Sequence, residues 1–209
     1  MDGKTIELEL RAEVWPQAQE SLKKHLEEIG VLHSQTKRLS VMYFGNIGAK
    51  KIDVRVRITN GDCEVVIKSG SFGSHDRVEM SQKINSTQFL GIIKIFTQFD
   101  FAMKIGERET FNYALPDDIT VSLVSAGSIS YIELEKMSSK SDVDQNHKQL
   151  KKLADQLGLQ LLESEEEFDL LCKRLDQKVD WPFHGTDDEY TRLTEIINRY
   201  VNYQKTAKP

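Results

Sequence analysis

The sequence predicts an α+β fold: an eight-stranded antiparallel β-barrel covered by helices. Most of the chain up to Met137 alternates apolar and polar side chains in short runs, which is typical of strands with one buried face. The rest of the chain has apolar residues at helical spacing. The strand-like runs number eight, and eight strands are enough to close a sheet without exposed edges.

Turn residues bound the expected strands. The Asn60-Gly61 pair, for example, is typical of a tight hairpin between two strands that pair directly. The strands are expected over residues 4–14, 39–45, 51–59, 63–69, 75–84, 101–113, 118–124 and 129–137.

Five helices are expected, one of them between strands. Pro16 favours the first turn of a helix that Gly30 ends. Ser164 and Glu167 have the spacing of a capping box at a helix start. The helices are expected over residues 17–29, 86–99, 142–157, 164–179 and 186–204.

The composition indicates a globular chain. Its 209 residues are 39% hydrophobic, which is enough for a core, and this length is typical of one domain. A net charge of -5 excludes a globally basic nucleic-acid binder, though not a local basic site. With only Cys63 and Cys172, a disulfide scaffold is also excluded.

The N-terminal segment MDGKTIELEL lacks the apolar run of a signal peptide. The most apolar stretch, residues 89–96, is too short to span a membrane. We therefore expect a cytoplasmic protein with neither a membrane nor a nucleic acid as its partner. A monomer and a homodimer are both compatible with the sequence.

The polar faces of the expected strands are dense in charge. Glu7, Glu9 and Arg11 share one face of the first strand, and Arg55 and Arg57 share one face of the third. The other aligned pairs are Glu64 with Lys68, Arg77 with Glu79, Lys104 with Arg108, and Glu133 with Glu135.

Two interpretations of these charged faces are open. In the first, they are solvated outer faces, as most charged surfaces are. In the second, the apolar faces lie outward under the helices, and the charged faces line a tunnel whose cations bind a polyanion. Carboxylates two residues apart would then hold a divalent metal, and cations plus a metal on one polyanion are typical of phosphoryl transfer.

Glu7-Leu8-Glu9-Leu10-Arg11 resembles the ExExK signature of the CYTH superfamily, the triphosphate tunnel metalloenzymes. Six later segments are similar to motifs of that family in the same order, and the likeness covers roughly residues 4–175. They are Arg55-Val56-Arg57, Glu64 to Lys68, Arg77-Val78-Glu79, Arg108, the Glu133-Leu134-Glu135 strand, and the helical segment 157–171.

The resemblance implies a triphosphate tunnel domain over residues 1–176 and a C-terminal helical extension over 177–209. It implies that a triphosphate binds in the tunnel with Mg²⁺ or Mn²⁺. Catalytic roles fall to Arg11 and Lys68, and metal binding to Glu7, Glu9, Glu133 and Glu135. Substrate contacts fall to Arg11, Arg55, Arg57, Lys68, Arg77 and Arg108, with Glu79 orienting the basic side chains.

Three positions depart from the family pattern. Arg11 stands where the signature has Lys, and Arg does not give up its proton at working pH. Gly106 stands two residues before Arg108, where the sixth strand often has a second basic residue. Ser122 stands near the position of a metal-binding Asp in the seventh strand, with Val124 as the other candidate for that position.

We predict a metal-dependent phosphohydrolase acting on inorganic triphosphate, a nucleoside triphosphate or thiamine triphosphate. One alternative is a class IV adenylate cyclase that makes cyclic AMP from ATP in the same cradle. A second is a non-catalytic polyphosphate or nucleotide binder, which the departures at Arg11 and Ser122 would favour. An interaction module with solvated strands is the third.

Overall fold

The computed structural model describes residues 6–48, 50–69 and 78–203. The chain divides into two compact units, each built from two segments. Unit 1 comprises Met1–Gln35 and Glu109–Leu175, and unit 2 comprises Thr36–Arg108 and Asp176–Pro209. The chain passes from unit 1 to unit 2 after Leu175, next to the domain boundary expected at residue 176, which itself stays a prediction.

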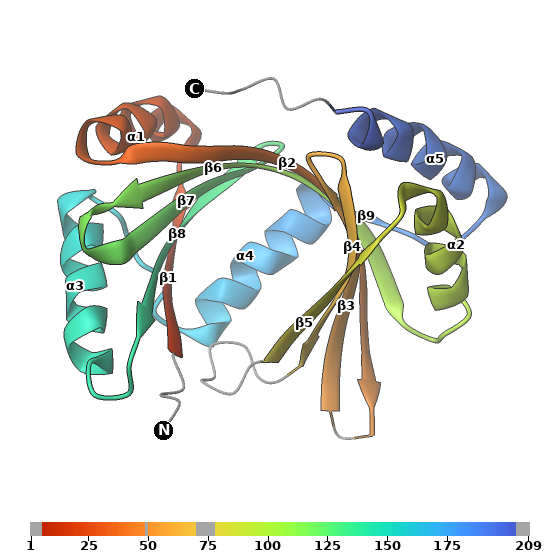
Figure 1. Cartoon of the computed structure of the whole chain (residues 1–209), viewed down its shortest axis with the longest axis horizontal. Helices are drawn as coiled ribbons and strands as arrows, with labels where there is room; N and C mark the ends of the chain where they lie inside the picture. Colours follow the sequence, from red (N-terminus) through yellow and green to blue (C-terminus); the bar gives the residue numbers. More distant parts are fainter. Residues whose placement is uncertain (1–5, 49, 70–77, 204–209) are drawn as a thin grey trace. The chain divides into compact units, whose positions relative to one another are not determined.

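The strands pair in an order that differs from their order in the chain (Figure 1). They are β1 (Ile6–Val14), β2 (Val31–Ile47), β3 (Lys50–Thr59), β4 (Asp62–Ser69), β5 (Val78–Ile84), β6 (Ala102–Leu115), β7 (Ile119–Ala126), β8 (Ile129–Ser138) and β9 (Trp181–Pro182). Neighbours follow the order β1-β8-β7-β6-β2-β3-β4-β5, with β9 beside β6. Within the described residues this order ends at β1 and β5, so closure into a barrel stays a prediction.

The five expected helices are present, and the α+β class is confirmed. They are α1 (Pro16–Ile29), α2 (Ser86–Phe96), α3 (Val143–Gln156), α4 (Glu165–Lys178) and α5 (Asp187–Val201). None of these described helices has the length and apolar character needed to cross a membrane.

Two strand segments differ from the expectation. Strand β2 begins at Val31, eight residues before the predicted start. The prediction missed residues 31–38 because they carry few apolar side chains and lack a clear alternation. Strand β9 was not predicted, since two residues ending in a proline show no period; it forms only because β6 offers it a partner.

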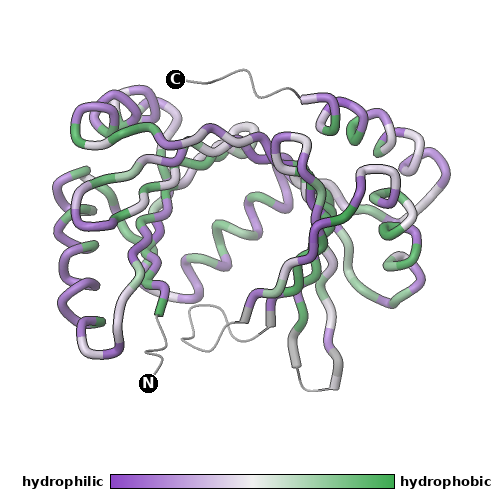
Figure 2. The backbone as a smooth tube through the Cα atoms, in the orientation of Figure 1, coloured by the Kyte–Doolittle hydropathy of each residue, from purple (hydrophilic) through white to green (hydrophobic). Residues whose placement is uncertain are grey.

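In unit 1, the apolar faces of the strands pack under helices α1 and α3. Leu8 of β1 and Ile132 and Leu134 of β8 are buried there. The helices add Leu22, Leu26, Leu150, Leu153 and Ala154 to the same core. Helix α3 lies alongside β1 and β8 (Figure 1), and it carries hydrophobic as well as hydrophilic residues (Figure 2). Burying each large apolar side chain contributes about 1.5–3 kcal/mol, which fixes this face toward the helices.

In unit 2, the apolar faces pack under helices α2 and α5. Val54, Val56 and Ile58 alternate along β3, and all three are buried. The helices contribute Phe89, Ile93, Leu193, Ile196 and Ile197 to this core. The C-terminal helix α5 therefore packs on strands of its own unit.

The predicted turn and cap chemistry is present. Asn60 and Gly61 both have positive φ, as a tight hairpin between the twisted strands β3 and β4 requires. Ser164 Oγ accepts the backbone N–H of Glu167 at 3.1 Å, and Glu167 returns a carboxylate oxygen to the N–H of Ser164, which caps α4.

The charged residues lie on the faces opposite these helices. Side chains alternate across a strand, so Arg55 and Arg57 project away from α2 and α5, and Glu9 and Arg11 project away from α1 and α3. The side chain of Arg57 is 12% exposed and that of Arg11 is 16% exposed. Such low exposure favours the interpretation in which helices cover the apolar faces over the one with solvated charges.

Candidate functional site

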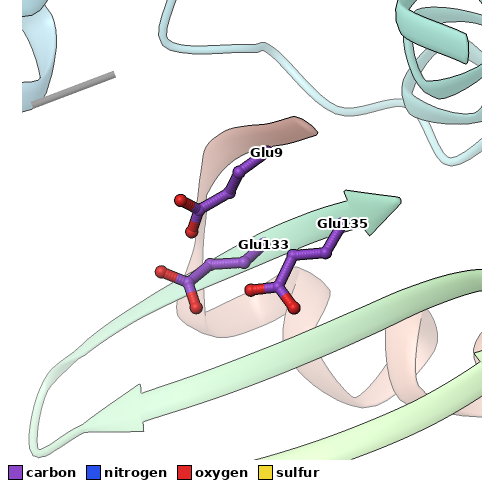
Figure 3. A group of neighbouring side chains, drawn as sticks. All are labelled: Glu9, Glu133 and Glu135. Atoms are coloured by element: carbon purple, nitrogen blue, oxygen red, sulfur yellow. The ribbon is translucent and has the colours of Figure 1, made fainter. Parts of the chain in front are cut away.

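An acidic cluster in unit 1 consists of Glu9, Glu133 and Glu135. Strands β1 and β8 are antiparallel, and their register places Glu9 opposite Glu135 and Arg11 opposite Glu133. The period of two brings all four side chains to the face away from the helices. Figure 3 shows the three carboxylates, one from β1 and two from β8, pointing to the same side.

The three carboxylates of the acidic cluster repel one another. One oxygen from each lies within 4.8 Å of the others, and all three residues are half-buried. Burial, reinforced by the negative charges of Glu133 and Glu135, raises the pKa of Glu9 from 4.5 to about 8, although Arg11 acts in the other direction. A cation at this cluster would relieve the repulsion.

Arg11 lies inside the acidic cluster. Its Nε donates to Glu133 Oε1 at 2.9 Å, its Nη2 pairs with Glu9, and its guanidinium lies 5.1 Å from the ring centre of Phe168 on α4. Burial opposes the charge, but Glu9 and Glu133 raise the pKa of Arg11 above its ordinary value. Arg11 is thus a permanent cation that lowers the net negative charge of the cluster, and its contact with phosphate stays a prediction.

The structure brings together three of the four expected metal ligands. Glu7 lies opposite Met137, is exposed, and does not belong to the acidic cluster. Ser122 of β7, near the position where the resemblance implies a metal-binding Asp, lies opposite Glu133 of β8. Ser122 Oγ donates to Asn112 Oδ1 at 2.8 Å, so this position supplies a neutral hydroxyl instead of a carboxylate.

A basic cluster in unit 2 consists of Arg55, Arg57 and Lys68, each paired with a carboxylate. Arg57 Nε donates to Glu64 Oε1 at 2.7 Å across the β3–β4 pair. The other two cations have similar partners. Arg55 makes two hydrogen bonds to Asp53, at 2.9 and 2.7 Å, and Lys68 Nζ lies 2.6 Å from Glu79.

Glu79 connects two members of the basic cluster. It lies opposite Lys68 in the β4–β5 pair and also accepts from Arg57 Nη2 at 3.4 Å. Burial opposes ionisation, but the hydrogen bond and charge of Lys68, with Arg57 and Arg55, hold the pKa of Glu79 below 4.5. Its predicted role in orienting cations toward a substrate stays a prediction. Arg77, another expected phosphate contact, lies outside the described residues.

The expected phosphate contact Arg108 is paired with an aspartate that the sequence did not single out. Its guanidinium donates to both carboxylate oxygens of Asp180, at 2.7 and 3.0 Å, and Lys104 Nζ lies 3.5 Å from the same carboxylate. Asp180 follows helix α4 as an isolated acidic residue next to Trp181-Pro182. No periodic pattern marks such a position, so only the fold could reveal it.

No protein-family model and no curated protein matches the chain significantly. Solved structures do match. A Pyrococcus horikoshii protein has a TM-score of 0.58 at 17% identity, over 80% of this chain and 99% of its own. A candidate adenylate cyclase from Vibrio parahaemolyticus has a TM-score of 0.52 at 15% identity, over 90% and 98% of the two chains. A candidate adenylyl cyclase from Hippeastrum, described as having a dominant triphosphatase activity, has a TM-score of 0.51 at 15% identity, over 77% and 91%.

These likenesses define the fold of the chain. The matched structures include proteins named for adenylate cyclase and triphosphatase activity, and each is covered over more than nine-tenths of its own length. At 15–17% identity these likenesses show a shared fold, in agreement with the resemblance that the sequence motifs indicate.

Proposed function

We propose that this protein is a metal-dependent phosphohydrolase that acts on a triphosphate. The observation that carries the proposal is the acidic cluster, whose three carboxylate oxygens lie within 4.8 Å of one another. The basic cluster, with three cations on one face of β3 and β4, supports it. A divalent cation and a polyphosphate are the two components that phosphoryl transfer requires.

The donor set of the acidic cluster suits a hard divalent cation. Mg²⁺ and Mn²⁺ prefer oxygen ligands, and Glu9, Glu133 and Glu135 offer six carboxylate oxygens. Arg11 offsets one negative charge of the cluster, and a bound cation would favour the ionised form of Glu9. A bound cation would neutralise negative charge on phosphoryl oxygens.

The side chains of the basic cluster suit phosphate oxygens. Guanidinium groups donate two parallel hydrogen bonds to a phosphate, and an ammonium group acts as a point charge. Hydrogen bonds to Asp53 and Glu64 already hold Arg55 and Arg57 in place, which lowers the entropy lost on binding. Hydrolysis then requires water to attack the terminal phosphorus, with charge developing on the oxygens that these cations face.

Cyclisation of ATP is the second candidate reaction. It is favoured by the likeness to two solved structures described as candidate adenylate cyclases. The same groups would bind the phosphates of ATP, but the ribose 3′-hydroxyl attacks the α-phosphorus and pyrophosphate leaves. The products therefore distinguish the two reactions.

The test is a product analysis with Mg²⁺ and, separately, Mn²⁺. Tripolyphosphate, ATP and thiamine triphosphate are incubated with the full chain, and phosphate, pyrophosphate and cyclic AMP are measured. Release of phosphate that stops with a chelator supports hydrolysis, whereas cyclic AMP with pyrophosphate supports cyclisation. Thermal stabilisation by these anions without turnover would contradict an enzymatic function and support a binding protein.

A further inference from the structure

Among the described residues of unit 2, Asp180 is the most deeply buried acidic side chain on the charged face. Its side chain is 1% exposed, and that of its partner Arg108 is 15% exposed. Both carboxylate oxygens accept from Arg108, and Lys104 approaches the same group while also pairing with Asp176. One carboxylate thus engages two cations that project from the same side of β6.

Gly106 provides the space for this carboxylate. Lys104, Gly106 and Arg108 are alternate residues of β6 and share one face. A Cβ atom at Gly106 would lie 2.6 Å from Asp180 Oδ1 and 2.9 Å from Arg108 Nη1. Any larger residue would push the carboxylate away, so the glycine and the aspartate depend on each other.

The chain fixes Asp180 through its next three residues. Trp181 and Pro182 form β9, which pairs with Ile105 and Lys104 of β6. The backbone N–H of Phe183 then donates to the carbonyl of Met103 at 3.0 Å, and the Phe183 side chain is buried in the core of unit 2. The backbone directly after Asp180 is thereby held against β6.

We infer that Asp180 occupies the anion-binding position of Arg108 and Lys104, and that it thereby limits how many phosphate groups a polyphosphate can place on this face. A carboxylate and a phosphate present the same pair of oxygens to a guanidinium. Separating a buried ion pair leaves one partner without its counter-charge, which is strongly unfavourable. Asp180 is 1% exposed, against 15% for Asp53 and 23% for Glu64, so a phosphate displaces Asp180 far less readily than the carboxylates of the basic cluster. Asp180 is a specificity-determining residue, and this role rests on the proposed function.

Arg108 lies on a strand that is not adjacent to the strand of Arg55. Met42 lies opposite Arg55 in the β2–β3 pair, and its Cε would be 3.0 Å from a Cβ atom at Gly106. Two strand spacings therefore separate β6 from β3, a distance of roughly 10 Å. An anion bound by Arg55 would reach Arg108 only with the additional phosphates of a longer chain.

Calorimetric titration with pyrophosphate, tripolyphosphate and tetrapolyphosphate tests the inference. In the wild-type protein, affinity should rise up to tripolyphosphate and then level off, with less than about a threefold gain from the fourth phosphate. In Asp180→Asn, tetrapolyphosphate should bind about tenfold more tightly or better, while pyrophosphate changes little. The matched control is Asp100→Asn, an exposed aspartate of the same unit, which should leave the series unchanged.

A double variant, Asp180→Asn with Arg108→Gln, tests whether the gain in tetrapolyphosphate affinity depends on Arg108. It should lose the tenfold improvement, since the released anion position needs the guanidinium. If Asp180→Asn fails to fold, the affinities of the wild-type protein for the three polyphosphates are the test. A tenfold rise in affinity from tripolyphosphate to tetrapolyphosphate then overturns the inference. A folded Asp180→Asn with the wild-type series overturns it as well.

The outcomes separate this inference from the proposed function. Wild-type protein that binds no polyphosphate contradicts the proposed function, yet a gain of binding in Asp180→Asn would still support the role of Asp180. If neither protein binds, both proposals are wrong. If the wild-type protein hydrolyses tripolyphosphate and Asp180→Asn shows the same series, only the inference is wrong.

Discussion

Glu9 on β1 and Glu135 on β8 are direct partners in an antiparallel strand pair. Two like charges in such positions destabilise a sheet, and a third carboxylate, Glu133, lies within 4.8 Å of both. Arg11 compensates only part of this repulsion. The arrangement is unfavourable for the sheet alone, and a bound divalent cation would make it favourable.

The first prediction concerns the ligands of this cation. Glu135→Gln keeps the shape of the acidic cluster but removes one negative charge, so Mg²⁺ or Mn²⁺ should bind about tenfold more weakly or worse, with activity falling in parallel. Glu7→Gln should have a much smaller effect, since Glu7 lies outside the cluster. Calorimetric metal titration measures both variants.

Glu20→Gln, a change at an exposed position of α1, is the matched control and should bind metal as the wild-type protein does. Equal losses in Glu7→Gln and Glu135→Gln would contradict the geometry. So would metal affinity that survives in Glu135→Gln.

The second prediction is a pH dependence that follows from Glu9. Its pKa is about 8 in the folded chain and near 4.5 in the unfolded chain, so the folded state binds more protons between these values. The free energy of unfolding without metal should therefore fall as the pH rises from about 4.5 toward 8. Thermal melts in a chelating buffer measure this slope.

Metal binding should reverse the slope. The cation competes with the proton on Glu9, so metal affinity should rise as the pH approaches 8, with a proton released on binding. Glu9→Gln removes the titrating group, so its difference from the wild-type protein isolates the contribution of Glu9. Identical pH profiles in the two proteins would show that Glu9 ionises normally.

The sequence could predict the faces of the strands because a period of two depends only on local alternation. On β3, Arg55 and Arg57 lie on the face away from the helices. The apolar residues between and beside them lie on the face that the helices cover. The order of the motifs also indicated a fold, and solved structures at low identity match the chain over most of its length.

The sequence could not predict what depends on register and on distant segments. Glu7 and Glu9 look equivalent in the chain, but only Glu9 has a carboxylate opposite it on β8. Asp180 is 72 residues from Arg108, and nothing in its local pattern indicates their contact. Pairing across a sheet and loop placement are tertiary properties, which local alternation does not encode.

The third prediction concerns the basic cluster. Arg57→Ala removes a charged donor on the strand face that we propose to bind phosphate, so tripolyphosphate should bind more weakly by about 1.5–3 kcal/mol. The fold should persist, because Arg57 lies on the face opposite the core of unit 2. Calorimetric titration measures the affinity, and far-ultraviolet circular dichroism checks the fold.

Arg199→Ala is the control for Arg57→Ala, since Arg199 is an exposed residue of α5 in the same unit. It removes the same charge from the chain but not from the strand face. Equal weakening by both variants would indicate a general charge effect and would contradict the basic cluster as the binding site.

The last prediction compares two glycines of unit 2. A Cβ atom at Gly45 on β2 would lie 2.1 Å from Cδ1 of Phe101, whose ring stacks on Phe99 with centroids 5.7 Å apart. Gly45→Ala forces this ring to move and should lower the free energy of unfolding by about 1–3 kcal/mol. A Cβ atom at Gly91 on α2 would meet nothing within 4 Å beyond the backbone of its own helix, so Gly91→Ala should raise the free energy of unfolding by about 0.5–1 kcal/mol through helix propensity. Urea denaturation measures both, and a stable Gly45→Ala would show that Phe101 does not pack against β2.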